Sequence, residues 1–294
     1  MKLRKITVRL VVALALAISS EAYAQLFDYD GMCYQLTTET TVGVLGDRDA
    51  LGDVVIPEKV SYEGKEYTVT SIGEFSFAFS KIRSVVIPAS VTEISPYAFS
   101  AIQDGEGPHR YSNPELTSIE VAADNPVFAS KNGALFNKHF TTLILAPKKV
   151  KKFIVPPTVD TIDSFAFYDC VSLQHIEMPS SVVSIGSEAF RNCSSLISIE
   201  LPSLLREIEY CAFANCTALT SIKIPDSIKI ISGSCFAYCT SLKSVTIPSS
   251  VKLIEAYAFY GCESLRLVKI PSSVKVIEDR AFDSTVKLVR EDVY

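Results

Sequence analysis

Residues 189–208 read AFRNCSSLISIELPSLLREI, and this pattern returns every 23 residues through the second half of the chain. Its most regular mark is a column of prolines at a constant spacing: Pro156, Pro179, Pro202, Pro225, Pro248 and Pro271. A fixed period of this length indicates a solenoid, in which each unit buries its apolar side only by stacking on its neighbours. The sequence therefore predicts a scaffold with a binding role and does not specify a ligand.

Other columns keep the same period on either side of the proline. The phenylalanines are Phe167, Phe190, Phe213, Phe236, Phe259 and Phe282, the cysteines Cys170, Cys193, Cys216, Cys239 and Cys262, and the leucines Leu173, Leu196, Leu219, Leu242, Leu265 and Leu288. Alternation such as Ile222, Lys223, Ile224 predicts a short strand with one buried face. Proline cannot donate to a ladder of stacked strands, so its column should lie in a turn just past the strand.

A second extended segment follows each proline, with apolar pairs such as Val251 and Ile254. The small residue and phenylalanine that come next leave room for one short helical turn. We therefore predict an α/β solenoid of mostly short parallel strands, with one short helical turn in each 23-residue coil. Ladders of Leu, Ile or Val, Ala and Phe should fill its interior.

The first half of the chain keeps the pattern with interruptions. We expect an N-terminal β cap over residues 25–54 and a solenoid over residues 55–294, with insertions near 61–70, 101–115 and 123–147. An Asn132-Gly133 turn between short apolar runs should sit in the last insertion.

Residues 1–24 carry the pattern of a secretory signal peptide. Lys2, Arg4, Lys5 and Arg9 precede an apolar run, and the small-residue site Ala22-Tyr23-Ala24 follows it. The run is shorter than the roughly 20 residues that span a bilayer. We therefore expect an exported protein, secreted, at the cell surface or periplasmic, with no membrane span in the mature chain. The net charge of -5 and the pI near 5.4 argue against nucleic acid as a partner.

Eight cysteines in an exported chain would normally suggest disulfides. Five of them share one interior column, however, where parallel Cβ vectors keep neighbouring thiols apart. We expect these five to be buried thiols that act as small hydrophobes and donate weakly to loop carbonyls. The oxidation state of Cys211 and Cys33 is left open.

No residues of this chain form a recognisable catalytic, metal or cofactor motif. His109, His139 and His175 are scattered, without a ligand or nucleophile partner at a known spacing. The prediction is a protein that is not an enzyme and has no cofactor. An enzyme assembled from the insertions 101–115 and 123–147 is the alternative from a different class.

The repeat leaves two sets of outward positions. On the strand face, the outward residues that precede each proline pass from acidic to basic, and the candidate partner-binding residues are Glu177, Glu200, Lys223, Lys243, Thr246, Arg266 and Lys269. On the second side, past the proline, the row Arg206, Lys229, Lys252 and Lys275 should be partly offset by Glu209, Glu255 and Glu278. Such rows can simply solvate a sheet, or they can form a complementary surface for a protein or an anionic glycan.

Tyrosines near the expected helical turns supply a third candidate surface. They are Tyr168, Tyr210, Tyr238, Tyr257 and Tyr260. Such amphipathic rings are enriched at interfaces, and they also cover apolar coils. Both interpretations stay open.

The repeat Ala-Phe-x-x-Cys-x-x-Leu-x-x-Ile-x-Ile-Pro-x-Ser-Val-x-x-Ile resembles the BspA-like leucine-rich-repeat proteins that anaerobic bacteria export. The resemblance covers roughly residues 54–288 and is closest over 156–288. It implies a right-handed leucine-rich-repeat solenoid, a secreted or cell-surface location, and adhesion to host extracellular proteins or other cells. The expected partner is an extracellular protein, such as a host matrix protein, or a glycan. It supplies no catalytic residues. The hypotheses are thus a binding module, a structural envelope protein, or an enzyme, and no oligomeric state is indicated.

Overall fold

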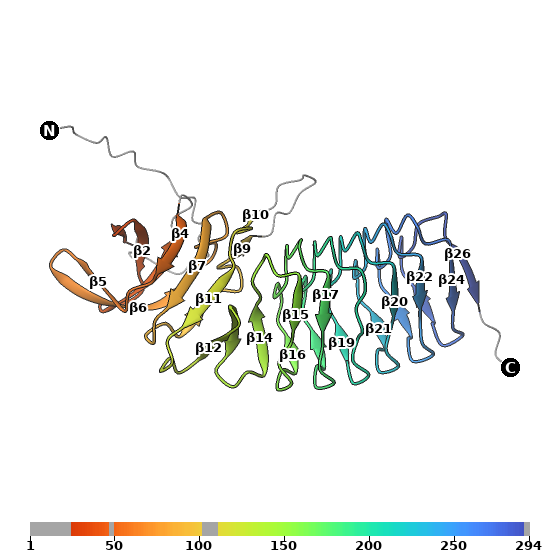
Figure 1. Ribbon diagram of the computed structural model, residues 1–294. Coiled ribbons are helices and arrows are strands. Elements are labelled where there is room, and N and C mark those ends of the chain that lie inside the picture. The colour runs from red at the N-terminus through yellow and green to blue at the C-terminus, as the bar shows by residue number, and fades with distance from the viewer. Residues whose placement is uncertain (1–24, 47–49, 102–110, 291–294) are drawn as a thin grey trace.

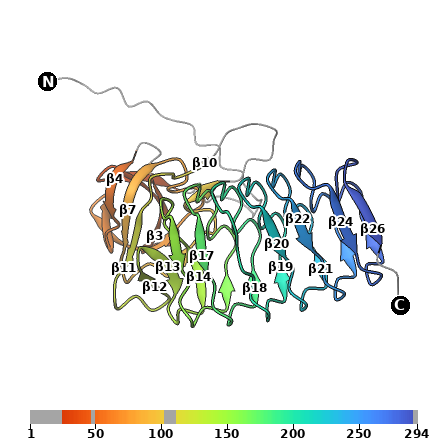
Figure 2. The ribbon, with the colours of Figure 1, turned by 45° about the vertical axis from the view of Figure 1, so that its right-hand side comes forward.

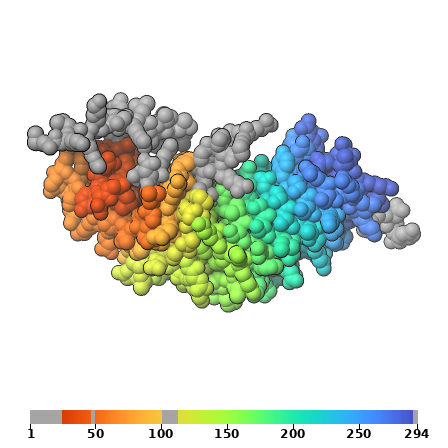
Figure 3. Space-filling view, turned by 45° about the horizontal axis from the view of Figure 1, so that its top comes forward, coloured from red at the N-terminus to blue at the C-terminus, as the bar shows by residue number. Residues whose placement is uncertain are grey.

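The computed structural model describes residues 25–46, 50–101 and 111–290 and arranges them as one elongated stack of β coils (Figure 1). The predicted signal peptide and most of the insertion at 101–115 lie outside the described residues. Most strand pairs beyond the N-terminal region are parallel, as the solenoid prediction required. In the space-filling view, the colours follow one another in sequence order along the molecule (Figure 3).

A curled sheet forms the N-terminal end. Its path is β1-β2-β3-β6-β5, β8 also pairs with β6, and the strands are β1 (Leu26–Tyr29), β2 (Met32–Leu36), β3 (Thr41–Gly46), β5 (Lys59–Tyr62), β6 (Lys65–Ile72) and β8 (Glu93–Ile94). The rings of Phe27 in β1 and Tyr62 in β5 stack with centroids 4.3 Å apart, so the two edges of the path approach each other. Tyr34 is fully buried beneath them.

The strand face begins beside this sheet. Its first three strands are parallel and lie in the order β11-β7-β4, with bounds β4 (Leu51–Val55), β7 (Lys81–Ile87) and β11 (Ser118–Val121). The second insertion leaves and returns through the antiparallel pair of β9 (Ser100–Ala101) and β10 (Tyr111–Ser112).

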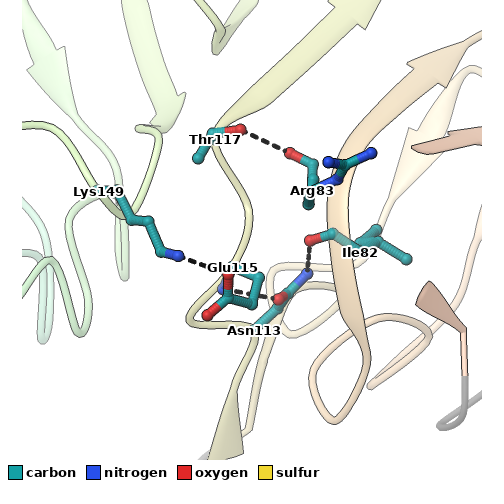
Figure 4. A network of polar contacts seen from close by, with 6 residues as sticks. All are labelled: Ile82, Arg83, Asn113, Glu115, Thr117 and Lys149. Atoms are coloured by element: carbon teal, nitrogen blue, oxygen red, sulfur yellow. Dashed lines mark hydrogen bonds and ion pairs between the residues drawn. The ribbon is translucent and has the colours of Figure 1, made fainter. Parts of the chain in front are cut away.

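A polar network fixes the point where this insertion rejoins the stack (Figure 4). The buried amide of Asn113 donates to the Ile82 carbonyl at 2.9 Å and accepts from the Glu115 N–H at 3.0 Å. The Thr117 hydroxyl donates to the Arg83 carbonyl at 3.0 Å, and Lys149 forms an ion pair with Glu115. The return of the chain is therefore held by both neighbouring coils.

A hairpin through the Asn132-Gly133 turn lies at the middle of the stack. It joins β12 (Phe128–Lys131) to β13 (Ala134–Asn137), and both turn residues have positive φ, as the sequence indicated. The same sheet continues along the second side in the order β12-β13-β14-β16-β18-β19, with β14 (Thr142–Leu145), β16 (Thr161–Ile162), β18 (Ser184–Ile185) and β19 (Glu207–Ile208).

The regular coils beyond the hairpin form two rows of short parallel strands, although the segment around Ile199 has no assigned strand (Figure 2). The strand face contains β15 (Lys152–Ile154), β17 (His175–Glu177), β20 (Ser221–Lys223), β22 (Ser244–Thr246), β24 (Leu267–Ile270) and β26 (Lys287–Arg290). The second side continues with β21 (Ile230–Ile231), β23 (Leu253–Ile254) and β25 (Val276–Ile277).

The phenylalanine column forms a continuous stack of rings through the core. The centroids of Phe190 and Phe213 are 5.0 Å apart with 2° between the ring planes, and those of Phe213 and Phe236 are 5.4 Å apart with 3°. The backbone follows the same register, because the Phe190 N–H donates to the Ala212 carbonyl at 2.7 Å in the next coil. Rings and amides thus repeat together from coil to coil.

The cysteine column is buried as expected. None of the eight cysteines, all of which lie in the described residues, forms a disulfide. The thiol of Cys193 donates to the Phe167 carbonyl of the preceding coil at 3.2 Å, and Cys216 makes the same contact with Phe190. Each weak S–H donor therefore ties two neighbouring phenylalanine turns together.

The prolines stand in turns just past the strands, which confirms the sequence prediction. Their carbonyls accept the N–H three residues later, for example Val251 N–H to Pro248 at 3.1 Å and Val274 N–H to Pro271 at 3.0 Å. The chain therefore bends between the two strand rows at a residue that has no N–H to leave unpaired.

The short helical turn expected in each coil is not confirmed, since the described residues contain no helix. The segment instead makes consecutive turns, each with a residue of positive φ, such as Glu188 at 57° and Asn192 at 63°. A helix cannot pass through left-handed residues. Hydrogen bonds to the next coil hold them, since the Asn192 N–H donates to the Ala214 carbonyl at 2.9 Å.

The leucine column ends earlier than the sequence predicted. Leu288 pairs in register with Val268, not with Leu265, and it is 41% exposed. The final strand is reached 20 residues after its partner rather than 23, and the structure describes no coil stacked beyond it. Val286 is the buried side chain at this end.

The stacked core predicts a large penalty for removing one ring. Replacement of Phe213, which is fully buried, by Ala should lower the free energy of unfolding by about 3 to 5 kcal/mol, because the two neighbouring rings lose their contact. Chemical denaturation of both proteins measures this. Tyr210→Ala, at a ring that is 55% exposed, is the control and should lose much less. Equal stability of Phe213→Ala and the parent would contradict a stacked core.

Candidate binding surface

All seven residues predicted on the strand face have exposed side chains. Glu177 lies in β17, Lys223 in β20, Thr246 in β22 and Lys269 in β24, while Glu200, Lys243 and Arg266 stand in the adjoining segments of their coils. Buried residues alternate with them, including Ile222 and Val268. The alternation directs Glu177, Lys223, Thr246 and Lys269 to the outer side of the strands, and Glu200, Lys243 and Arg266 are exposed beside the strand row.

The strand register brings the basic residues together on the last coils. Lys223 lies beside Thr246, because β20 and β22 pair in parallel as Ser221 with Ser244 and Lys223 with Thr246. Lys287 of β26, which sequence reasoning did not include, pairs with Leu267 of β24 and adds a further exposed cation. Its inclusion depends on the shortened final coil, which the 23-residue period does not reveal.

The acidic end differs from the basic end in how its charges are engaged. Glu177 forms an ion pair with Lys152 of the preceding coil. Among the ion pairs of the described residues, none includes Lys223, Lys243, Arg266 or Lys269. The positive charge of the basic end is therefore available to a partner.

Aliphatic side chains lie exposed among these charges. The exposed fractions are 58% for Ile154, 46% for Ile197 and 47% for Leu267. Ile197 and Leu267 lie in the coils of Glu200 and Lys269, whereas Ile154 belongs to a coil that sequence reasoning did not assign to this surface. A face with charge and apolar area together resembles the mixed surface of a protein interface.

The tyrosines separate into exposed and buried members. Tyr210, Tyr238 and Tyr257 are 55%, 49% and 38% exposed, whereas Tyr168 is buried, contrary to its place in the expected surface. Tyr238 and Tyr260 meet edge to face at 5.6 Å. A Cβ at Gly261 would lie 2.6 Å from the Tyr238 ring, so this tyrosine covers the next coil. Covering the stack explains its position without a ligand.

Titratable side chains are spread out in the described residues. The described residues hold no cluster of His, Cys, Asp or Glu that could bind a metal ion, and His139 and His175 are exposed on separate segments. A hollow between β8 and β14, lined by Phe99, Ser100 and Asp163 among others, has a volume of about 20 Å³. Burial raises the pKa of the Asp163 carboxyl there. A space of this size holds about one water molecule and no substrate.

A buried lysine beside the cysteine column was missed by sequence reasoning. Lys148 is 1% exposed, and its ammonium donates to the Tyr168 carbonyl at 2.5 Å. Lysine is seldom fully buried, so the sequence gave no reason to place this residue in the core. Its amide donates to the Leu116 carbonyl, which places the side chain where the inserted coils join the regular ones. Its contacts indicate a structural role.

The surroundings of Cys211 do not activate its thiol. Cys211 is buried, and burial raises its pKa, although Tyr210 and Arg191 partly oppose this. Burial likewise raises the pKa of Cys170 to about 11 and that of Cys262 to about 12. Cys33 is the one cysteine that is partly exposed among the eight. Thiols with raised pKa values are poor nucleophiles at neutral pH.

The repeat pattern of the BspA type leucine rich repeat region matches residues 57–105 and 148–289, in six copies. The chain belongs to this family. The matched ranges leave out residues 106–147, which contain the hairpin and the later part of the insertion before it. A leucine-rich repeat protein from Eubacterium ventriosum has the same fold, with 27% identity, a TM-score of 0.63, and coverage of 84% of this chain and 68% of its own.

The pneumococcal vaccine antigen PcpA has a similar fold. Its TM-score is 0.54 at 18% identity, with coverage of 92% of this chain and 99% of its own. No curated protein is similar enough to this chain to count as a match. No described residues form a helix long and apolar enough to cross a membrane.

The cysteine column predicts a loss of stability at alkaline pH. Unfolded thiols ionise near pH 9.0, while the folded chain keeps Cys170 protonated to about pH 11 and Cys262 to about pH 12. The unfolded state therefore binds fewer protons in this window, and the free energy of unfolding falls as pH rises through it. Denaturation at about pH 8 and about pH 10.5 measures the fall. Burial raises the pKa of Cys193, Cys216 and Cys239 as well. The variant Cys193→Ala, Cys216→Ala, Cys239→Ala should therefore show a smaller fall, and an equally steep one would contradict the assignment.

Proposed function

We propose that this protein is a non-enzymatic, exported binding module that presents the strand face to an extracellular protein or glycan. The observation that carries the proposal is the exposed basic group Lys223, Lys243, Arg266 and Lys269, which lies on one face without carboxylate partners among the described residues. Opposite charge on a partner would steer its approach and fix its register on the stack.

The charge gradient supports an oriented complex. Glu200 precedes the four cations along the stack, while Glu177 is already paired with Lys152, so an acidic partner would favour the end of the face that carries the cations. Exposed Leu267 lies among the cations and would lose its contact with water on binding. Host matrix proteins and anionic glycans offer acidic surfaces of this kind.

Export of the chain is part of the same proposal. The sequence of residues 1–24 supports it, with its basic start, short apolar run and small-residue site. Membership in the BspA-type repeat family is consistent with a surface or secreted location, since a pneumococcal antigen shares the fold. The cysteines of the column are buried, so oxidants reach them poorly. They can therefore stay reduced in an exported protein.

The alternatives are a structural envelope protein and an enzyme with a site in the insertions 101–115 and 123–147, and most of the first insertion lies outside the described residues. The proposal predicts that reversing four charges, Lys223→Glu, Lys243→Glu, Arg266→Glu and Lys269→Glu, weakens capture of a matrix protein or anionic glycan. The parent chain first identifies the partner in a pull-down from a panel of such molecules.

The variant should lose about 1 kcal/mol or more of binding free energy, and its binding should depend less on salt. The reason is that these cations would pair with negative charges of the partner. The control reverses Arg206, Lys229, Lys252 and Lys275 on the second side. If the strand-face variant binds the partner as tightly as the parent chain, the strand face is not the binding surface. A parent chain that captures no partner from the panel would favour a structural role.

A further inference from the structure

A strip of alternating lysine and aliphatic side chains runs along the second side of the last regular coils. Its members are the pairs Lys229-Ile230, Lys252-Leu253 and Lys275-Val276, and we call it the lysine–aliphatic strip. The strands hold it in register, since Ile230 pairs with Leu253 and Leu253 with Val276. The lysines stack on one another in adjacent coils, because the Lys252 N–H donates to the Lys229 carbonyl at 2.8 Å and the Lys275 N–H donates to the Lys252 carbonyl at 2.8 Å.

The side chains of the strip are exposed. All three lysines face solvent, Ile230 is 45% exposed and Val276 is 50% exposed, with Leu253 half-buried between them. The alternating Ile231 and Ile254 point into the core. Two parallel columns therefore cross the coils, one cationic and one aliphatic, with a rise of roughly 4.8 Å from coil to coil.

The glutamates expected to offset these lysines are engaged elsewhere. Glu209 accepts the N–H of Ser187 at 3.0 Å, Glu255 that of Gly233 at 2.8 Å, and Glu278 that of Ala256 at 2.9 Å. Each carboxylate thus reaches back to the turn of the preceding coil. Among the described residues, no ion pair includes Lys229, Lys252 or Lys275, and the Lys275 ammonium donates to the Ser272 carbonyl.

The fold does not require this composition. The same two columns carry Asp160-Thr161, Val183-Ser184 and Arg206-Glu207 in the coils that precede the strip. Like charges on neighbouring strands destabilise a sheet, and exposed aliphatic side chains gain nothing from water. Three consecutive coils nevertheless carry both a column of like charges and a column of exposed aliphatic side chains. The strip is therefore suited to a partner that is both anionic and apolar.

We propose that the lysine–aliphatic strip docks the protein onto an anionic lipid surface. Lysine ammonium groups would lie at the phosphate level, while Ile230, Leu253 and Val276 enter the boundary below it. A soluble polyanion would use only the cationic column. The lipid surface is the occupant that uses both columns, and it fits the even, straight spacing that the strand register imposes.

The strip is separate from the strand face of the same coils. The proline turns at Pro225, Pro248 and Pro271 stand between the two rows of strands. Docking through the second side would leave the strand face open to its own partner. The lipid inference therefore does not rest on the proposed adhesion function, and each can fail alone.

Co-sedimentation with lipid vesicles tests the inference. The chain without its predicted signal peptide is mixed with vesicles of phosphatidylglycerol and phosphatidylcholine, or of phosphatidylcholine alone, because the apolar leader would itself bind lipid. Binding is expected to the anionic vesicles only. Lys229→Glu, Lys252→Glu, Lys275→Glu should lower the partition coefficient at least roughly a hundredfold, since the loss of each lysine near an anionic surface costs about fivefold and each new glutamate adds repulsion.

The aliphatic column has its own variant. Ile230→Thr, Leu253→Thr, Val276→Thr keeps the lysines and the strand preference, and it should weaken binding on the order of tenfold through lost apolar burial. The matched control, Lys223→Glu, Lys243→Glu, Lys269→Glu, makes the same change in net charge on the strand face. It should retain most of the binding. Unfolding curves of all variants confirm that they stay folded.

Three outcomes would overturn the inference. They are failure of the parent chain to bind anionic vesicles, an equal loss in the strand-face control, and threonine variants that bind as tightly as the parent. The last outcome, with competition by inorganic polyphosphate, would assign the cationic column to a soluble polyanion.

Discussion

The ring stack that runs from Phe167 to Phe282 is the contact on which the rest of the structure depends. Its centroids are 4.8 to 5.4 Å apart, close to the spacing of hydrogen-bonded strands, so one register satisfies both the rings and the backbone. No coil can shift by one residue without breaking the stack, the amide ladder and the thiol contacts together. This constraint makes the interior uniform and leaves the outward positions free to vary.

That freedom explains why the two sides of the same coils can differ in chemistry. In the coil of residues 221–231, stacking fixes the buried Ile222, Ile228 and Ile231. Lys223 lies on the strand face and Lys229 on the second side. Changing an outward residue alters charge without disturbing the ladder. A solenoid of this kind can therefore carry two surfaces with different partners on a single core.

Much of the fold was predictable because the period itself encodes stacking. The proline turns, the buried Phe213 and the thiol contact of Cys193 all followed from column positions. The consecutive turns around Glu188 and Asn192 were not predictable, since their left-handed residues are held by contacts with the next coil rather than by local preference. The prediction that Leu288 continues the leucine column was wrong because the final coil is shorter than the period. The strand-face side chains were placed correctly, but the direction of Glu209 and Glu255 depends on turn amides that no spacing reveals.

Native-state hydrogen exchange of the amides of Phe190, Phe213 and Phe236 tests the central claim most directly. These amides donate to the carbonyls of the next coil, and their neighbouring rings exclude water. The account predicts that they exchange only through unfolding of the stack, with protection equal to the global free energy of unfolding. Exchange at the rate of exposed amides, or unequal protection among the three under conditions where the protein is folded, would contradict in-register stacking as the source of stability.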